Sequence, residues 1–453
     1  MCALTENEKK NCLYKPQNLV IRRVDDFYLA LNSDLPNIMV MDEIGKRFFD
    51  LCNGKRTADE IIEIILKEKP HDISIDELRA FISSMIDSNF LFWKPPSSPR
   101  KIEQNLYNLR QLYLHITRAC NLRCKHCYVE AGEPLDHELT APEMLRVIDD
   151  FATLGGETLI ITGGEPFLRK EALYGIFKEA KNVGIKEIFI ETNGTLLSNH
   201  DIDKCKKYDI NLAVSLDGAV PETNDFIRGS GTYQKTIETI KKLVSANVKV
   251  KIGMTIMKLN YKEAQKMVLL AKKLNVNSLS FSVVRAIGRA EANRNLLLSL
   301  EEMYTIIIDS WKKARELEVT TQLEDQFKSF EKLTRRDTCG AGTARLLVSS
   351  NGDVYPCNMF LEFPEFKAGN LRKQRLKEIW ENAEALKVLR RLSVLDINGC
   401  NICDLKFVCG ICPAEIYKTH GGFHQKPEFC SLYKELTWTL LEELGRKMWN
   451  EGG

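Results

Sequence analysis

The sequence lacks any apolar run of the ~18–20 residues that a membrane-spanning helix requires. Its opening residues, MCALTENEKKNC, also lack the apolar core of an export signal. Charge of one sign is missing too, because 64 lysines and arginines offset 62 aspartates and glutamates and leave a net charge of +2. Such a balance gives no support for general binding of nucleic acid. We therefore expect a cytoplasmic protein with neither a membrane nor a nucleic acid as its partner.

Cysteine, in contrast, is abundant, with 14 in 453 residues. In a small secreted domain this number would indicate disulfides, but a long chain without an export signal favours metal ligation. Three cysteines lie close together at Cys120, Cys124 and Cys127. A second, downstream set comprises Cys339, Cys357, Cys400, Cys403, Cys409, Cys412 and Cys430. The scattered Cys2, Cys12, Cys52 and Cys205 are predicted to be ordinary thiols.

Residues 1–93 are predicted to form a small winged-helix-like domain. Short β-like runs at 18–22 and 27–31 precede an amphipathic pattern at 41–52, which Asn53-Gly54 is predicted to stop. Two capping boxes, Thr57 with Glu60 and Ser74 with Glu77, predict the next two helices, and 90–93 is predicted as a closing strand. The polar, proline-rich stretch at 94–105 indicates a linker.

Residues 106–316 alternate apolar strands with amphipathic helices, which predicts an α/β fold with a parallel sheet. Thr140 and Glu143 form a capping box, with a proline in the first turn of the helix it opens. Six βα units fit a partial (β/α)6 TIM-type barrel, whose chemistry gathers at the C-terminal ends of the strands. The strands are predicted at 112–117, 159–162, 187–192, 212–216, 248–255 and 278–284.

Suggestive residues follow four of these strands. The three close cysteines follow the first strand, and the turn Gly163-Gly164-Glu165-Pro166 follows the second. Asn193 follows the third and Asp217 the fourth, where Asp217 could simply cap a turn.

Beyond the barrel, 317–338 is predicted to be a polar, helical connector. Periodicity then fades in 339–453, where cysteines, glycines and turns are frequent. Such composition is typical of a segment held together by metal rather than by a large apolar core. An amphipathic helix is predicted near the end of the chain, at 432–449.

The cysteine loop, with Tyr128 after it and the Gly163–Pro166 turn one βα unit later, resembles that of the radical S-adenosylmethionine (SAM) superfamily. The resemblance implies a [4Fe–4S] cluster on Cys120, Cys124 and Cys127, whose open iron binds the amine and carboxylate of SAM. One electron then cleaves SAM into methionine and a 5′-deoxyadenosyl radical. Half of a zinc site is the alternative for the loop.

The same resemblance implies contacts to SAM. Tyr128 follows the cluster, and Gly163, Gly164, Glu165 and Pro166 run along the methionine moiety, where the glutamate and backbone satisfy its ammonium group. Asn193 and Ser215 are candidates for ribose or carboxylate contacts, and Arg228 for pairing with the carboxylate. A strand-to-helix turn, turn formers and a surface ion pair are the alternatives for these residues.

The downstream cysteines resemble the SPASM domain, which carries two auxiliary [4Fe–4S] clusters. Family matching places Cys339, Cys357 and Cys412 on the first auxiliary cluster. It places Cys400, Cys403, Cys409 and Cys430 on the second. Three thiolates leave one iron open, whereas four close the site. A zinc ribbon on the two CxxC pairs is the alternative, although it leaves Cys339, Cys357 and Cys430 unexplained.

The order of elements in residues 1–93 resembles the PqqD-like recognition element of enzymes that modify ribosomally made peptides (RiPPs). The resemblance implies that the leader of a precursor peptide pairs as an extra strand with an edge strand of the domain. It thus implies a radical SAM oxidoreductase and peptide maturase, with ferredoxin or flavodoxin as electron donor. The expected product is a cysteine sulfur-to-carbon thioether crosslink of the sactipeptide kind.

Three other functions are compatible with parts of the sequence. A sulfatase-type maturase is one, but its family has an aspartate where Asn358 stands, and an amide cannot act as a general base. Biosynthesis of a cofactor or haem-like molecule is the second. A non-enzymatic zinc scaffold with a winged-helix module is the third.

Overall fold

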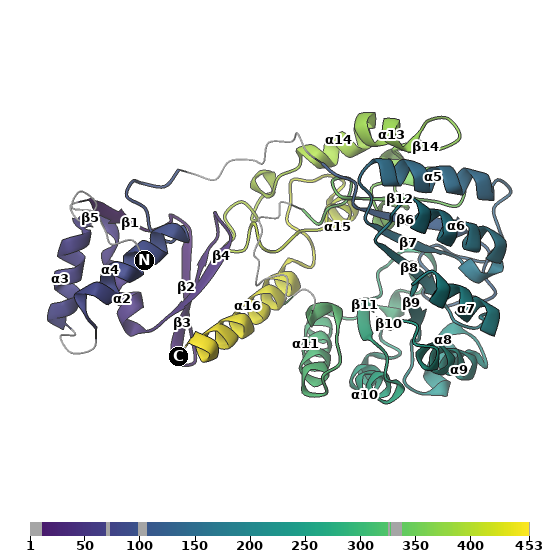
Figure 1. Ribbon diagram of the computed structural model, residues 1–453, viewed down its shortest axis with the longest axis horizontal. Coiled ribbons are helices and arrows are strands. Elements are labelled where there is room, and N and C mark those ends of the chain that lie inside the picture. Colours follow the sequence, from purple (N-terminus) through teal and green to yellow (C-terminus); the bar gives the residue numbers. More distant parts are fainter. Residues whose placement is uncertain (1–10, 69–72, 98–106, 325–326, 328–337, 453) are drawn as a thin grey trace.

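A nine-stranded sheet forms the centre of the protein in the computed structural model, which describes residues 11–68, 73–97, 107–324, 327 and 338–452 (Figure 1). Its strand order is β11-β10-β9-β8-β7-β6-β12-β13-β14. Strands β6 to β11 are parallel to their neighbours. They span Gln111–Thr117, Thr158–Gly163, Glu187–Thr192, Asn211–Ser215, Val250–Ile256 and Ser278–Val283. The predicted α/β partial barrel is therefore confirmed.

Helices cover the outer side of these strands (Figure 1). They are α5 (Ala141–Thr153), α6 (Lys170–Asn182), α7 (Asn199–Lys207), α8 (Pro221–Arg228), α9 (Thr232–Ser245), α10 (Ala264–Leu274) and α11 (Leu300–Glu316). The Thr140–Glu143 capping box is present at the start of α5, as predicted. Among the described residues, no helix is both long and apolar enough to cross a membrane.

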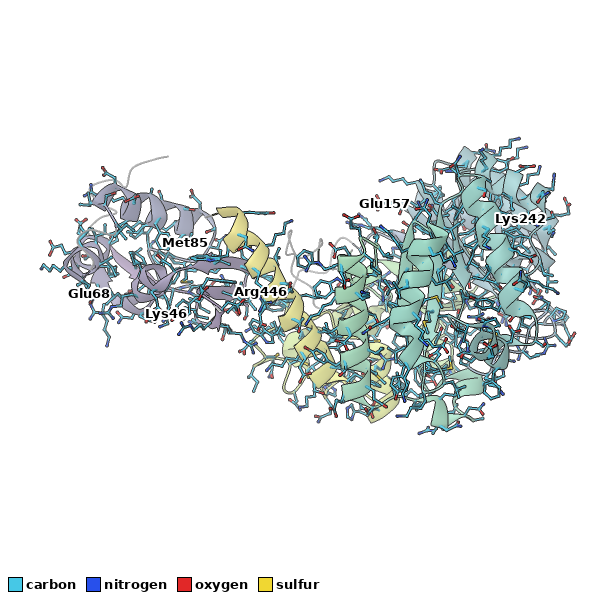
Figure 2. The ribbon with its side chains drawn as sticks, turned by 90° about the horizontal axis from the view of Figure 1, so that it is seen from below. Lys46, Glu68, Met85, Glu157, Lys242 and Arg446 are labelled. Carbon is cyan, nitrogen blue, oxygen red and sulfur yellow. The ribbon has the colours of Figure 1, made fainter. Side chains whose placement is uncertain are left out.

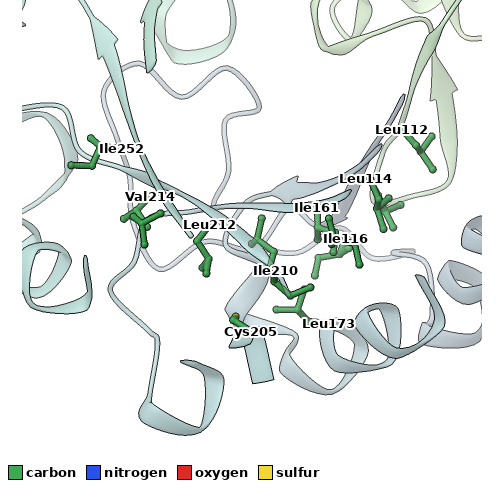
Figure 3. Packing of buried hydrophobic residues seen from close by; sticks show 14 of the residues in the cluster. Leu112, Leu114, Ile116, Ile161, Leu173, Cys205, Ile210, Leu212, Val214 and Ile252 are labelled. Atoms are coloured by element: carbon green, nitrogen blue, oxygen red, sulfur yellow. The ribbon is translucent and has the colours of Figure 1, made fainter. Parts of the chain in front are cut away.

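Side chains of the barrel strands alternate between the apolar core under the helices and the opposite face of the sheet. Leu112, Leu114 and Ile116 of β6 are fully buried and pack toward the helices, as do Ile161 of β7 and Leu212 of β9 (Figure 3). Because successive side chains of a strand point to opposite faces, the residues between them line the inner face of the barrel. We call that inner face the lumen.

The sheet continues past β6 into the cysteine-rich part of the chain, which the sequence did not predict. Strand β12 (Arg345–Val348) pairs parallel with β6, and β13 (Asp353–Tyr355) and β14 (Gly369–Asn370) follow in antiparallel order. These strands are too short to show a period of two. Two short helices follow, α13 (Leu376–Asn382) and α14 (Glu384–Arg391). Most of the predicted connector at 317–338 lies outside the described residues.

The N-terminal module comprises residues 11–93 and has its own apolar core. Strands β2 (Leu19–Val24), β3 (Phe27–Asn32) and β4 (Asn37–Met41) form an antiparallel sheet, and β1 (Cys12–Tyr14) pairs with β5 (Asn53–Thr57). Its helices are α2 (Glu43–Leu51), α3 (Ala58–Glu68) and α4 (Ile75–Asp87). Both predicted capping boxes are present. The winged-helix comparison stays a prediction.

Two local predictions for this module are wrong, and one is confirmed with an addition. The helix predicted at 41–52 begins after Asp42, whose Oδ1 accepts the Gly45 N–H at 2.8 Å, because the preceding apolar run forms β4. The helix ends before Asn53 and Gly54, as predicted, and these two residues also open β5. The strand predicted at 90–93 is a single bridge to Tyr14.

The module packs against the C-terminal helix α16 (Cys430–Gly452), which starts two residues before its predicted position. Phe27 stacks on Trp449 with ring centroids 5.4 Å apart. The Arg22 guanidinium lies 3.7 Å from the centroid of the Trp438 ring. Figure 2 shows Arg446 of α16 beside the module, and its Nε lies 2.8 Å from Asp25 Oδ2.

A buried ion pair adds a second attachment. Lys406 Nζ lies 2.9 Å from Asp34 Oδ1, and their side chains are only 5% and 13% exposed. The neighbouring Ser33 hydroxyl donates to the Asp404 carbonyl. The module is therefore joined directly to the loop between Cys403 and Cys409.

We expect Lys406→Ala to destabilise this attachment by about 1–3 kcal/mol, because the Asp34 carboxylate loses its ammonium partner and keeps the Asn18 amide, which donates to both of its oxygens at 2.9 Å. Thermal unfolding and hydrogen exchange in 32–38 and 400–410 measure the effect. The matched control is Lys46→Ala, which breaks an exposed pair with Asp50 and should cost less than about 1 kcal/mol. Equal effects of the two substitutions would contradict the prediction.

Candidate active site

The loop after β6 brings three thiols together. Cys120, Cys124 and Cys127 lie within electrostatic range of one another. Cys120 Sγ accepts the Leu122 N–H and Cys127 Sγ accepts the Ala131 N–H, each at 3.4 Å. Burial raises the pKa of Cys120 to about 11 and also raises that of Cys124. A positive partner is therefore needed to form thiolates here.

Within the part of the chain that the structure describes, no three His, Cys, Asp or Glu side chains converge on one metal ion. A four-iron cluster does not require the thiols to converge on one point, because each thiolate binds a different iron. Three neighbouring thiols beside a guanidinium have the chemistry that such a cluster requires. The donor set therefore fits the cluster that the resemblance implies.

The Gly163–Pro166 turn packs directly against this loop. The Gly164 N–H donates to the Thr117 carbonyl at 2.7 Å, and the Glu165 N–H donates to the Ala119 carbonyl at 2.8 Å. A Cβ on Gly164 would lie 2.0 Å from the Ala119 oxygen, and Gly163 has a φ of +123°. The glycines are therefore required by the approach of the two chain segments, whether or not a ligand is bound.

The Glu165 carboxylate is fully buried where β7 and β8 end. Its Oε1 accepts the Thr192 hydroxyl at 2.8 Å and the Phe167 N–H at 3.1 Å, and its Oε2 accepts the Asn193 N–H at 2.8 Å. A carboxylate has about four acceptor sites, so one remains for a ligand. Burial raises the pKa of Glu165. Pro166 opens a short 3-10 helix after it.

Asn193 and Ser215 lie at neighbouring strand ends, in different surroundings. The Asn193 amide donates to Asn121 Oδ1 at 2.9 Å and thereby contacts the cysteine loop. Ser215 is the last residue of β9, and its hydroxyl has no hydrogen-bond partner among the described residues. Ser215 is therefore the freer of the two to bind a ligand.

Arg228, at the end of α8, lies between a thiol and a carboxylate. Its Nε is 2.7 Å from Asp217 Oδ2, and its Nη1 is 3.9 Å from Cys124 Sγ. Asp217 is fully buried, is 3.3 Å from His126 Nε2 and accepts the Thr255 N–H at 2.7 Å. Asp217 thus does more than cap a turn, since it orients the guanidinium beside the cysteine loop.

Sequence reasoning also missed Arg289. Its Nε donates to the Cys124 carbonyl at 2.8 Å, and its Nη1 donates to the Ala131 carbonyl at 3.0 Å. Gly288 packs so closely that a Cβ there would lie 2.5 Å from the Cys127 oxygen. Only the tertiary structure reveals this support, because the segment carries no motif of its own.

The lumen contains polar residues that sequence reasoning did not single out. Its wall includes Tyr113 and His115 of β6, Thr162 of β7, Glu191 of β8 and Lys251 of β10. The Thr162 hydroxyl donates to Glu191 Oε2 at 2.9 Å, and burial raises the pKa of Glu191. Strand parity, counted from the buried leucines of β6, could have identified these positions.

Tyr128 faces this polar wall. Its hydroxyl lies 3.2 Å from His115 Nε2, and burial lowers the pKa of His115 to about 4. A cavity of about 360 Å³ opens beside the two side chains. Its lining includes Thr117, Gly163, Gly288, Tyr355 and Glu362. A small substrate group can therefore reach the neighbourhood of the cysteine loop.

The downstream cysteines assemble into two groups. We call Cys339, Cys357 and Cys412 the first auxiliary group, since they lie within electrostatic range of one another. A hydrogen bond between Cys339 and Cys412 lowers the pKa of Cys339 and raises that of Cys412.

The second auxiliary group comprises Cys400, Cys403, Cys409 and Cys430, which also lie within electrostatic range of one another. The division into two groups follows the family matching made from the sequence. Cys430 begins α16, so the helix that contacts the N-terminal module also contributes to this group.

Two family models match the chain. Residues 114–271 match the radical SAM superfamily, and residues 339–404 match the SPASM iron–sulfur cluster-binding domain. The first match begins within β6, and the second begins at Cys339.

Individual relatives agree with this class. The chain is 30% identical to an AdoMet-dependent heme synthase of Methanosarcina barkeri, over 71% of this chain and 96% of that protein. It is 25% identical to the subtilosin biosynthesis protein AlbA of Bacillus subtilis, over 85% of this chain and 87% of AlbA. The fold is similar to SuiB of Streptococcus suis in complex with S-adenosylmethionine, with a TM-score of 0.60 and 17% sequence identity. That comparison covers 92% of this chain and 99% of SuiB.

The chain therefore belongs to the radical SAM enzymes that carry a SPASM iron–sulfur domain.

We expect Gly164→Ala to displace the cysteine loop, because the new Cβ would clash with the Ala119 carbonyl. The reconstituted variant should retain less iron and unfold at a lower temperature. Gly175→Ala is the control, since its nearest neighbour would be Leu145 Cδ2 at 3.9 Å and alanine favours the helix by about 0.5–1 kcal/mol. Normal iron retention in Gly164→Ala would contradict the prediction.

We also expect His115 to destabilise the fold in acid. Its pKa of about 4 in the folded chain lies below the value of about 6.5 in an unfolded one, so only the unfolded chain takes up a proton between these values. This contribution to stability is complete above about pH 6.5 and decreases by about 2 kcal/mol at about pH 5.

Thermal unfolding at about pH 7 and about pH 5 tests this expectation. Wild-type protein should lose more stability than His115→Gln over this interval, because glutamine does not titrate. The difference between the two proteins isolates His115 from other groups that titrate in acid. The same loss in both would show that His115 does not contribute.

Proposed function

We propose that this enzyme modifies a ribosomally made precursor peptide and joins a cysteine sulfur to a carbon in a thioether crosslink. The observation that carries the proposal is the N-terminal module, whose sheet is attached to the body of the enzyme beside the second auxiliary group. A small-molecule enzyme has no evident need for such a module. We propose the domain division 1–93, 94–105, 106–316, 317–338 and 339–453.

Similarity to peptide-modifying enzymes extends into this module. The SuiB comparison leaves 8% of the chain uncovered, which is fewer residues than the module contains, so the similarity reaches into it. One SuiB structure contains the precursor peptide SuiA. AlbA, a bacteriocin biosynthesis protein, matches 85% of the chain, compared with 71% for the heme synthase.

The leader is proposed to bind along an outer strand of the module. Neither β2 nor β4 has a backbone hydrogen-bond partner on its outer side among the described residues. Unpaired N–H and C=O groups of an edge strand bind an extended peptide by adding it as a further strand. The same module then holds the peptide and remains attached to the cysteine-rich part of the enzyme.

When bound to SAM, the cluster supplies a carbon-centred radical that removes hydrogen from an unactivated carbon. Cys120, Cys124 and Cys127 would hold this cluster, and the Arg228 guanidinium would favour the thiolate of Cys124. Glu165 has an acceptor site for the SAM ammonium group, and the Ser215 hydroxyl, which none of the described residues binds, is available for the ribose or carboxylate. Tyr128, Asn193 and the glycine turn complete the pocket.

The auxiliary groups fit the remaining needs of thioether formation. Joining sulfur to carbon removes one hydrogen atom from the carbon, one proton from the thiol and one electron. The second auxiliary group has four thiols and would hold a closed cluster, whereas the first has three and would leave one iron free for a peptide thiolate. Ferredoxin or flavodoxin is the proposed electron donor, and the cytoplasm the proposed location.

We expect the full chain, reconstituted without oxygen, to hold about twelve irons in three clusters. Cys430→Ser should remove about four of them, while Cys205→Ser should remove none, since Cys205 is buried in the barrel core. Iron and sulfide analysis measures both outcomes. Zinc in place of iron would exclude the proposal.

The assay of function uses a short, cysteine-bearing peptide encoded beside the gene. With SAM and a reductant, the peptide should lose two hydrogen atoms for each bond formed, and replacing the acceptor cysteine should prevent that loss. The core peptide without its leader should react poorly, and leader added separately should restore part of the reaction. Equal reaction without leader would contradict the role proposed for the module.

A haem-like substrate is the second candidate, because the chain is 30% identical to the Methanosarcina barkeri heme synthase. Iron coproporphyrin III, the compound made by another Methanosarcina barkeri relative, provides the test. Its consumption, coupled to formation of 5′-deoxyadenosine, would favour this candidate over the peptide. The two assays therefore separate the candidates directly.

A further inference from the structure

A buried carboxylate lies between the two auxiliary groups. Glu415 belongs to the first turn of α15 (Pro413–His420), and its residue surface is only 7% exposed. The side chain lies within electrostatic range of Cys409 and Cys430 of the second auxiliary group. Cys412 of the first auxiliary group is the N-cap of the same helix, and the Glu415 main chain beside it lowers the pKa of that thiol. Glu415 thus lies on the same helix start as one group, while its carboxylate is joined to Phe429, the residue before Cys430 of the other group.

Three donors or cations surround the carboxylate. The Tyr433 hydroxyl donates to Glu415 Oε2 at 2.8 Å, and the Phe429 N–H donates to Oε1 at 3.1 Å. Arg285, just beyond β11, donates from Nη2 to the Tyr433 hydroxyl at 3.2 Å and lies 4.0 Å from Oε2. Its guanidinium also lies 4.0 Å from the centroid of the Phe429 ring.

A purely mechanical role is one explanation, since these contacts connect the barrel, α15 and α16. An apolar side chain would connect the same elements without the cost of burying a charge. The negative charge of Glu415 also opposes ionisation of the neighbouring cysteines, which must lose their protons to bind iron. The location of Glu415 therefore points to an electrostatic role.

We propose that Glu415 sets the reduction potentials of the two auxiliary clusters relative to each other. The inference rests on the proposal that the seven downstream cysteines hold two clusters, but it does not depend on the substrate. Reduction adds one electron to a cluster, and nearby negative charge opposes that addition. Glu415 therefore lowers the potential of the second cluster more than that of the first.

Tyr433 and Arg285 moderate this effect. The hydrogen bond from the Tyr433 hydroxyl and the positive charge of the Arg285 guanidinium partly neutralise the Glu415 carboxylate. The thiolates of the second auxiliary group therefore experience less of its negative charge. Two substitutions consequently have opposite signs. Glu415→Gln removes the charge and should raise the potential of the second cluster. Tyr433→Phe removes a donor, leaves the charge more exposed to the cluster and should lower that potential.

The experiment is a redox titration of the anaerobically reconstituted full chain, followed by electron paramagnetic resonance. Glu365→Gln is the matched control, because this carboxylate also accepts from a tyrosine, Tyr417 at 2.7 Å, but is exposed. Iron content and thermal unfolding show whether each variant folds. The control should leave both auxiliary potentials unchanged.

Opposite shifts in Glu415→Gln and Tyr433→Phe, with full iron content, would support the proposal. Unchanged potentials in both, or shifts of the same sign, would overturn it and leave Glu415 with a mechanical role. Should Glu415→Gln lose iron, Tyr433→Phe alone decides, since a mechanical role predicts no lowering of the potential. Wild-type protein with fewer than two auxiliary clusters would instead refute the cluster assignment on which the proposed function rests.

Discussion

Parallel pairing of β6 with β12 is the constraint on which the arrangement of the cysteines depends. Strand β6 leads into Cys120, and β12 leads through β13 to Cys357. Because the ladder of hydrogen bonds allows one register, it determines how far the first auxiliary group lies from the cysteine loop. Tyr113, on the lumen side of β6, lies within electrostatic range of both Glu191 and Cys357. The barrel and the cysteine-rich region thus share one sheet.

Much of the fold follows from local sequence signals. The six parallel strands carry buried apolar residues at alternate positions. The capping boxes at Thr140 and Ser74 are complete within four residues, so both signals can be found in the sequence. Strand β12 behaves differently, because its four residues show no strand pattern and only tertiary pairing, with β6 on one side and β13 on the other, makes it a strand. The start of the helix predicted at 41–52 is misplaced for a similar reason. Met41 continues the apolar pattern of that helix, but it pairs as the last residue of β4.

The candidate site divides in the same way. Cysteines and the glycine turn are close in sequence and form recognisable motifs. Asp217, Arg289 and Glu415 each act across a tertiary contact, so no spacing predicts their partners. Arg228 illustrates the difference: its position was found from the sequence, whereas its pairing with Asp217 became evident only in the structure. Buried charge is thus the part of this site that sequence patterns describe least well.

The attachment between the N-terminal module and the rest of the chain has a consequence for how such enzymes diversify. If the module were a freely tethered arm, evolution or an engineer could exchange it at the linker alone. Here its sheet shares an apolar cluster with α16, and Asp34 completes a charge pair with Lys406. A transplanted module would have to bring a compatible C-terminal helix and cysteine loop with it. The two ends of the chain are therefore expected to be inherited together.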